Sequence, residues 1–212
     1  MSINSNSSNY KSGNIVSHIS FYPVDILIVF VSVIGVAQFW LTAESYISLL
    51  AYTGGFDVSV VTAIWSHSSV QHLGNNLLGL LIYRLYFSPK EFQLFNSYSS
   101  IFIYAVVLGS IVNSIAYVTT VSLGYEFGYV IGISAVMFSL YGIQLVSLVT
   151  NSGSLNPLSL QRVLLLCNSL LIVGYPTYMM IVNLQFNLGS FGHALGFVSG
   201  SLFASIMLLV NY

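Results

Sequence analysis

The chain has 212 residues, of which 56% are hydrophobic and only 4% are charged, and its mean hydropathy is +0.88. This composition lies far outside the range of soluble domains and predicts an integral membrane protein. The formal net charge of -1 offers no basic field for nucleic acid, and the single cysteine, Cys167, excludes an internal disulfide or a cysteine metal cluster.

Apolar runs long enough to cross a bilayer recur along most of the chain. The opening stretch is rich in Ser and Asn, and we interpret residues 1–20 as a disordered cytoplasmic tail. A membrane-spanning helix needs about 20 mostly apolar residues. The remaining membrane domain, residues 21–212, is predicted to hold six spans: residues 23–41, 70–87, 101–122, 133–150, 160–182 and 191–210.

The connection between the first two spans, residues 42–69, is the only long one. It contains the aromatic residues Tyr52, Phe56 and Trp65. Aromatic side chains are enriched where a membrane meets water. We therefore expect this connection to lie along the outer interface of the membrane.

The few positive charges predict the orientation of the chain, because Lys and Arg are retained on the cytoplasmic side. All of them flank the same ends of the predicted spans, whereas the opposite connections hold none and carry Glu44, Asp57 and Glu126. The positive residues are Lys11, Arg84, Lys90 and Arg162. We expect a multi-pass protein of the cell membrane with both termini in the cytoplasm.

Polar side chains gather at the outer ends of three spans, and a polar group inside a membrane needs a partner or a function. The first group lies at the start of the second span. His72 and Asn76 are four residues apart, so on a helix they share one face, whereas Asn75 points elsewhere. His67 lies five residues before His72 in the sequence.

Two further groups open the fourth and sixth spans. Gly132 and Ser134 lie where the free N–H groups of a first helical turn would stabilise an oxyanion. His193 is followed by Gly196 and Gly200, a spacing that lets another helix approach closely. A serine, a histidine to take its proton, and a second histidine with an amide are the parts needed for acyl transfer. The topology places all three groups at a similar depth, which predicts one site.

Together these residues resemble the motifs of the rhomboid proteases, from about residue 60 to residue 200. The order, the spacing and the helices that hold the motifs all agree with that family. The matching residues are His67, His72 and Asn76 around the start of the second span, Gly132 and Ser134 around the start of the fourth, and His193, Gly196 and Gly200 in the sixth.

The resemblance implies an all-α bundle of six transmembrane helices that acts as an intramembrane serine endopeptidase without a cofactor or metal. Ser134 would be the nucleophile and His193 the general base, with no carboxylate to orient it. The oxyanion hole would consist of His72, Asn76 and the N–H of Ser134. The partner would be a membrane protein whose transmembrane segment is cleaved within the bilayer, at a site open to the outer side.

Two residues close to Ser134 in the sequence depart from the family pattern. Ala135 stands where the serine motif usually has glycine, and its methyl group leaves the backbone N–H intact. Phe138 occupies a position where the family often has tyrosine. We expect Phe138 to stack on the ring of His193 without offering a hydroxyl group.

Other functions are compatible with parts of this pattern. A proteolytically inactive rhomboid-like protein that binds membrane clients would share the fold, although retention of Ser134 and His193 counts against it. A small transporter would carry polar groups deep in both leaflets, and a protein assembled by glycine packing gives no reason for histidines and an asparagine at one depth. Zinc hydrolysis is disfavoured because no acidic residue accompanies the histidines in the spans.

Overall fold

The structure of the chain is a computed structural model. The described residues are 22–40, 54, 58–86, 98–124, 132–150, 163, 167 and 188–211. The predicted tail, residues 1–20, lies outside them. So does the predicted fifth span, residues 160–182, apart from Val163 and Cys167, which are both helical.

The other five predicted spans are helices with bounds close to those expected. They are α1 (Pro23–Trp40), α4 (Val70–Tyr86), α5 (Tyr98–Ser122), α6 (Ser134–Thr150) and α8 (Leu188–Asn211). Three of these contain stretches long and apolar enough to cross a membrane, at Pro23–Trp40, Ser99–Thr119 and Phe191–Val210. Within the described ranges every regular element is a helix. The chain is therefore an all-α membrane protein, as predicted.

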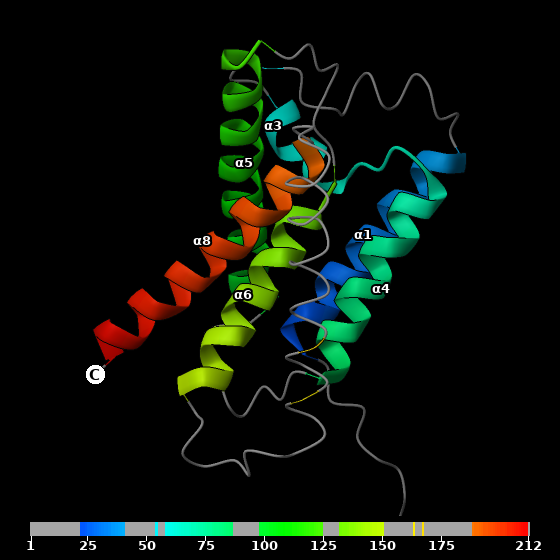
Figure 1. The fold of residues 1–212 in the computed structure, drawn as a ribbon. Helices are drawn as coiled ribbons and strands as arrows, with labels where there is room; N and C mark the ends of the chain where they lie inside the picture. Colours follow the sequence, from blue (N-terminus) through cyan, green and yellow to red (C-terminus); the bar gives the residue numbers. More distant parts are fainter. Residues whose placement is uncertain are drawn as a thin grey trace, which may run out of the picture.

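An ion pair joins the start of α1 to the end of α4. The Asp25 carboxylate accepts the N–H of Tyr22 at 2.7 Å and the Nε–H of Arg84 at 2.8 Å, and the Arg84 guanidinium lies 3.7 Å from the Tyr22 ring centroid. Because the first turn of one helix meets the last turn of the other, α1 and α4 run antiparallel, side by side (Figure 1). This arrangement brings the end of α1 to the start of α4.

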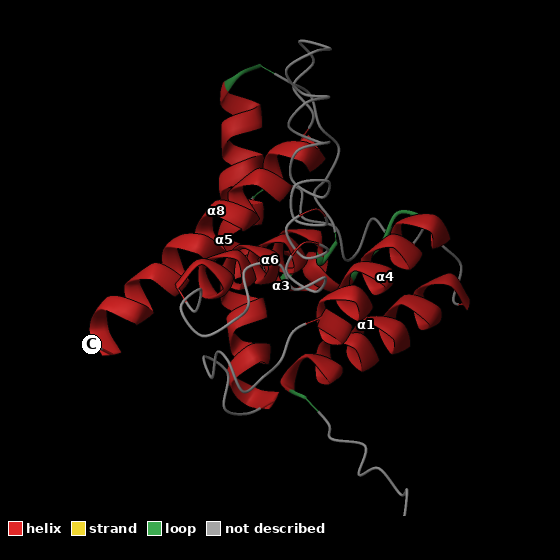
Figure 2. Cartoon of the chain, turned by 60° about the horizontal axis from the view of Figure 1, so that its bottom comes forward, coloured by secondary structure: helices red, strands yellow, loops and turns green. Residues whose placement is uncertain are grey.

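Helix α6 contacts α4, α5 and α8 (Figures 1 and 2). Most of its side chains are buried. Its packing on α8 is close because glycines line the contact. A Cβ atom at Gly196 would overlap the carbonyl oxygen of Ala135, and one at Gly200 would overlap that of Ser139. The predicted role of the glycine row in helix packing is confirmed.

The connection before α4 forms a short helix, α3 (Ser59–Thr62), followed by a 3₁₀ turn, η1 (Ala63–Trp65). Its tryptophan belongs to the core. Trp65 is buried, with its ring centroid 4.8 Å from that of Phe30 on α1 and 5.2 Å from that of Phe102 on α5. Trp65 therefore joins two helices in the core. Tyr52 and Phe56 lie outside the described residues.

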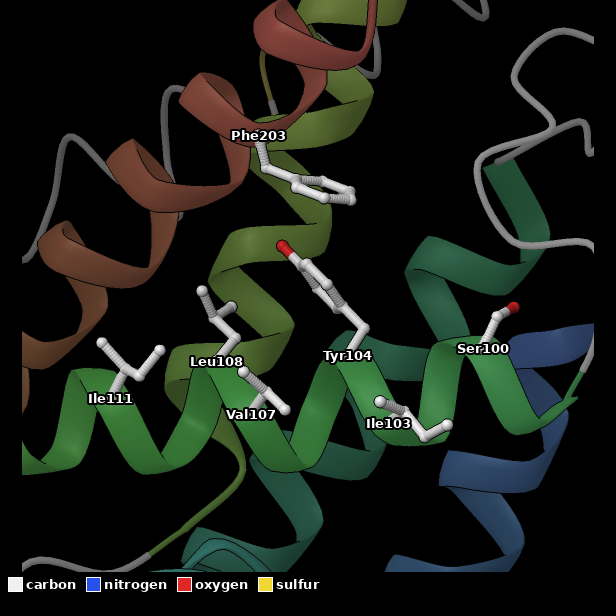
Figure 3. A pocket seen from close by; sticks show the side chains of 7 residues that line it. All are labelled: Ser100, Ile103, Tyr104, Val107, Leu108, Ile111 and Phe203. Carbon is white, nitrogen blue, oxygen red and sulfur yellow. The ribbon is translucent and has the colours of Figure 1, made fainter.

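A groove of about 520 Å³ runs between α5 and α8 (Figure 3). Tyr104, Leu108 and Ile111 of α5 line one wall, and Phe203 of α8 lies across from them. The Tyr104 hydroxyl forms a hydrogen bond with the hydroxyl of Ser139 on α6. The polar end of Tyr104 is thus satisfied inside the bundle, and it ties α5 to the helix that carries Ser134.

Candidate active site

Gly132 brings the segment before α6 against α4. Its φ of +107° lies in a region that favours glycine, and its N–H donates to the Ala63 carbonyl at 2.7 Å. A Cβ atom at Gly132 would lie 2.9 Å from both Cε1 and Nε2 of His72. The chain therefore enters α6 directly beside the His72 imidazole, and only glycine fits this approach.

Ser134 begins α6, as the sequence predicts, and its side chain is half-buried. The first backbone hydrogen bond of the helix runs from the N–H of Met137 to the carbonyl of Ile133 at 3.0 Å. The N–H of Ser134 precedes that bond, so it belongs to the first turn, where N–H groups have no partner within the helix. A hydroxyl and a backbone donor are thus presented together at a helix end that favours negative charge.

Asn76 lies one helical turn after His72 on α4. It is 3% exposed, and its Nδ2 has no hydrogen-bond partner in the structure. The same Nδ2 is 3.6 Å from the place that a Gly132 Cβ would occupy. An unsatisfied buried amide donor is costly, so its position beside the segment that leads to Ser134 requires an explanation. Asn75 is exposed, as its helical position predicts.

His72 is held by two serines that precede it. Its backbone N–H donates to Oγ of Ser69 at 3.0 Å, and its Nδ1 lies 3.2 Å from Oγ of Ser68. When the Ser68 hydroxyl donates to Nδ1, the neutral ring carries its proton on Nε2. Nε2 is the atom that faces Gly132, so His72 can present a donor on the same side as Asn76.

His193 reaches this region from the second turn of α8. Its ring stacks on Phe138, with centroids 4.2 Å apart and planes inclined by 14°, so the predicted stack is present. Gly196, one turn further, contacts the backbone of Ala135. Both residues are described, and no hydrogen bond joins the Ser134 hydroxyl to the His193 ring in this structure. Helix packing therefore places Ser134 and His193 near the starts of two helices that pack against each other, without a hydrogen bond between them.

His67 supports His72 from behind. It is fully buried, and its ring meets the His72 ring edge-on, with centroids 5.1 Å apart. Neither of its ring nitrogens has a hydrogen-bond partner. Burial, and secondarily the charge of His72, lowers the pKa of His67 to about 4. His67 is thus a neutral, buried ring at physiological pH.

Gln38 escaped prediction from the sequence. Its fully buried side chain donates from Nε2 to the carbonyl of His67 at 2.5 Å, and its Oε1 accepts the N–H of His67 at 2.9 Å. The available signal was a glutamine inside an apolar run, since a polar side chain within a span needs a partner. Among the described residues, no group of three His, Cys, Asp or Glu side chains could hold a metal ion.

The fold and the site together define a polytopic α-helical membrane protein with serine, histidine and asparagine residues near the starts of α4, α6 and α8. The family model for the Rhomboid domain matches residues 57–210. The chain belongs to the rhomboid family. A comparison with curated proteins gives no match.

Proposed function

We propose that this rhomboid protein is an intramembrane serine endopeptidase that cleaves transmembrane segments of other membrane proteins. One observation carries the proposal: the unpaired Nδ2 of Asn76 and the Nε2 of His72 both border Gly132, two residues before Ser134. Donors placed in advance beside a serine at a helix start are what a developing oxyanion requires. Because the Nδ2 of Asn76 has no partner, it can donate to that oxygen.

In this mechanism the hydroxyl of Ser134 attacks the carbonyl carbon of the scissile peptide bond as its proton passes to His193. The negative oxygen of the tetrahedral intermediate is received by the Ser134 N–H, His72 and Asn76. His193 then protonates the leaving amine, and a water molecule hydrolyses the acyl-enzyme by the same steps. The stack on Phe138 fixes the plane of the His193 ring in place of the carboxylate of a triad.

The place of the reaction follows from the proposed topology. We expect both termini of this cell-membrane protein to lie in the cytoplasm, because the Lys and Arg residues lie on one side of the spans. The start of α4, the start of α6 and His193 on α8 then lie on the outer side of the membrane. Water enters the site from that side. The partner in this scheme is a membrane protein with a transmembrane helix, met within the bilayer.

Covalent labelling tests the chemistry without a known substrate. Detergent-solubilised protein is incubated with a fluorescent alkyl fluorophosphonate, which phosphonylates an activated serine. We expect the probe to label the wild type and to fail to label Ser134→Ala and His193→Ala. Ser205→Ala is the control and should be labelled like the wild type, because Ser205 is an exposed serine on α8. Equal labelling of wild type and Ser134→Ala rules the proposal out.

A proteolytically inactive rhomboid-like protein that binds membrane clients is the second candidate. The absence of a Ser134–His193 hydrogen bond in the structure is the observation in its favour. Catalytic hydrogen bonds in unliganded enzymes are often long and tighten only with substrate bound, which weakens that observation. The two candidates separate in the same experiment, because the inactive protein would not react with the probe at any serine.

A further inference from the structure

We propose that Gln38 is a positioning residue for the candidate oxyanion donors: its side-chain amide, bonded in both directions to the backbone of His67, fixes the segment that sets His72 and Asn76 beside Gly132. This inference rests on the proposed function and adds a residue from α1 to the machinery of that site.

The contact between Gln38 and His67 is a two-bond clamp. The amide donates to the His67 carbonyl and accepts from the His67 N–H, so the side chain imitates the pairing of one strand residue with another. Two opposed bonds restrain both the position and the rotation of the His67 peptide units. The amide is fully buried, so water cannot replace either bond when the side chain is removed.

The clamp lies at the point where the chain turns from η1 into α4. His67 follows Ser66, whose backbone is extended, and α4 begins three residues later at Val70. The His67 ring contacts the His72 ring, and Gly35, on the preceding turn of α1, lies directly against Leu73. Gln38 therefore holds the backbone of His67, whose ring contacts the ring of His72. The contact of Gly35 with Leu73 fixes α1 close to the same turn of α4.

The His72 ring has little room for displacement on its other side. It borders Gly132 so closely that a Cβ there would lie 2.9 Å from two of its ring atoms. A shift of the His67 segment by a fraction of an ångström would move Nε2 of His72 relative to Ser134. Stabilisation of a developing charge depends steeply on such distances.

The chain provides a matched control in Gln144. This glutamine, on α6, is also buried, but neither its Nε2 nor its Oε1 has a hydrogen-bond partner. Methionine has nearly the same length and volume as glutamine and no amide. Gln38→Met and Gln144→Met therefore make the same chemical change, and only the first removes the clamp.

The experiment measures fluorophosphonate labelling of the full chain in detergent at several probe concentrations, which separates the saturating rate constant from the half-saturating concentration. Gln38→Met is expected to lower the rate constant about ten-fold or more, with half-saturation changed less than about two-fold, because the donors act on the charge that forms and not on the bound probe. Gln144→Met is expected to react like the wild type. Equal losses in both variants would assign Gln38 a merely structural role and overturn the inference.

Gln38→Glu keeps the inference testable if Gln38→Met does not fold. A protonated carboxyl group can form both clamp bonds, and burial favours the protonated form, so this variant should react within about three-fold of the wild type at pH 6. Its rate relative to the wild type should fall as the pH rises and the carboxyl ionises. A rate at pH 6 as low as that of Gln38→Met contradicts the clamp. If the wild type is labelled at Ser134 and Gln38→Met reacts at the same rate, only the role of Gln38 is refuted. If the wild type is not labelled, the proposed function is refuted and this inference with it.

Discussion

The imidazole of His72 lies directly against the backbone of Gly132, in the one place where a side chain on residue 132 would collide with it. This contact joins the polar start of α4 to the start of α6. It also makes the glycine doubly necessary, since its φ of +107° is one that other residues rarely adopt.

Gly132→Ala should therefore strongly reduce the reactivity of Ser134. The added methyl group forces His72 away from the serine, and the loss of one oxyanion donor lowers the labelling rate by about 100-fold or more. The backbone strain alone costs about 1–2 kcal/mol of folding free energy. Gly124→Ala is the control, because Gly124 has a φ of +78° with open space around it. A Gly132→Ala protein that reacts as fast as Gly124→Ala would contradict this account.

The contact between α6 and α8 predicts a loss of stability when glycine is replaced there. A methyl group at Gly200 would overlap the carbonyl oxygen of Ser139, so the two helices must move apart. Gly200→Ala is expected to lower the free energy of unfolding by about 2 kcal/mol, measured by thermal or denaturant unfolding in detergent. Gly74→Ala, on the exposed face of α4 with nothing nearby, should be neutral or slightly stabilising. Similar losses at both positions would argue against close helix packing as the cause.

The stack of Phe138 on His193 predicts different outcomes for two substitutions. Phe138→Tyr keeps the ring and should retain the wild-type labelling rate. Phe138→Leu keeps most of the volume but not the stack, and the loss of about 1 kcal/mol of ring contact should slow labelling by about ten-fold or less. Phe203→Leu removes a ring from the wall of the α5–α8 groove and should leave the rate unchanged. If Phe138→Leu also reacts at the wild-type rate, the stack does not orient His193.

The buried ring of His67 predicts that the protein loses stability in acid. The pKa of this histidine falls from 6.5 in the unfolded chain to about 4 in the folded protein, mainly through burial. Between these two pKa values the unfolded chain binds a proton that the folded protein does not. The contribution of neutral His67 to the free energy of unfolding is therefore fully present above pH 6.5 and is lost as the pH falls toward 4. The loss approaches about 3 kcal/mol at the acid end.

Melting temperatures measured between pH 7.5 and pH 4.5 check this prediction. His67→Gln removes the titrating ring, so its melting temperature should depend less steeply on pH than that of the wild type, even if it is lower overall. Parallel curves for the two proteins would mean that the pKa of His67 is not lowered by folding.

The sequence alone determined where the helices lie. The lengths of the apolar runs predicted α1 at residues 23–41 and α6 at 133–150, against observed bounds of Pro23–Trp40 and Ser134–Thr150. At α8 the helix begins at Leu188, three residues before the predicted start, because a helix continues through polar residues once its hydrogen-bond ladder is formed. Spacing also placed His72 and Asn76 on one face of a helix, since the period of a helix is a local property of the chain.

Tertiary structure alone decided which side chains meet across helices. The ring of Trp65 packs on Phe30 and Phe102, which come from two helices that are distant from each other in the sequence. Gln38 gave no sign of its partner, since the backbone of His67 that it binds carries no residue-specific signal. Hydropathy and periodicity indicate whether a segment is buried and which secondary structure it adopts. The identity of the group that fills each contact depends on how the helices pack, and only the folded chain supplies it.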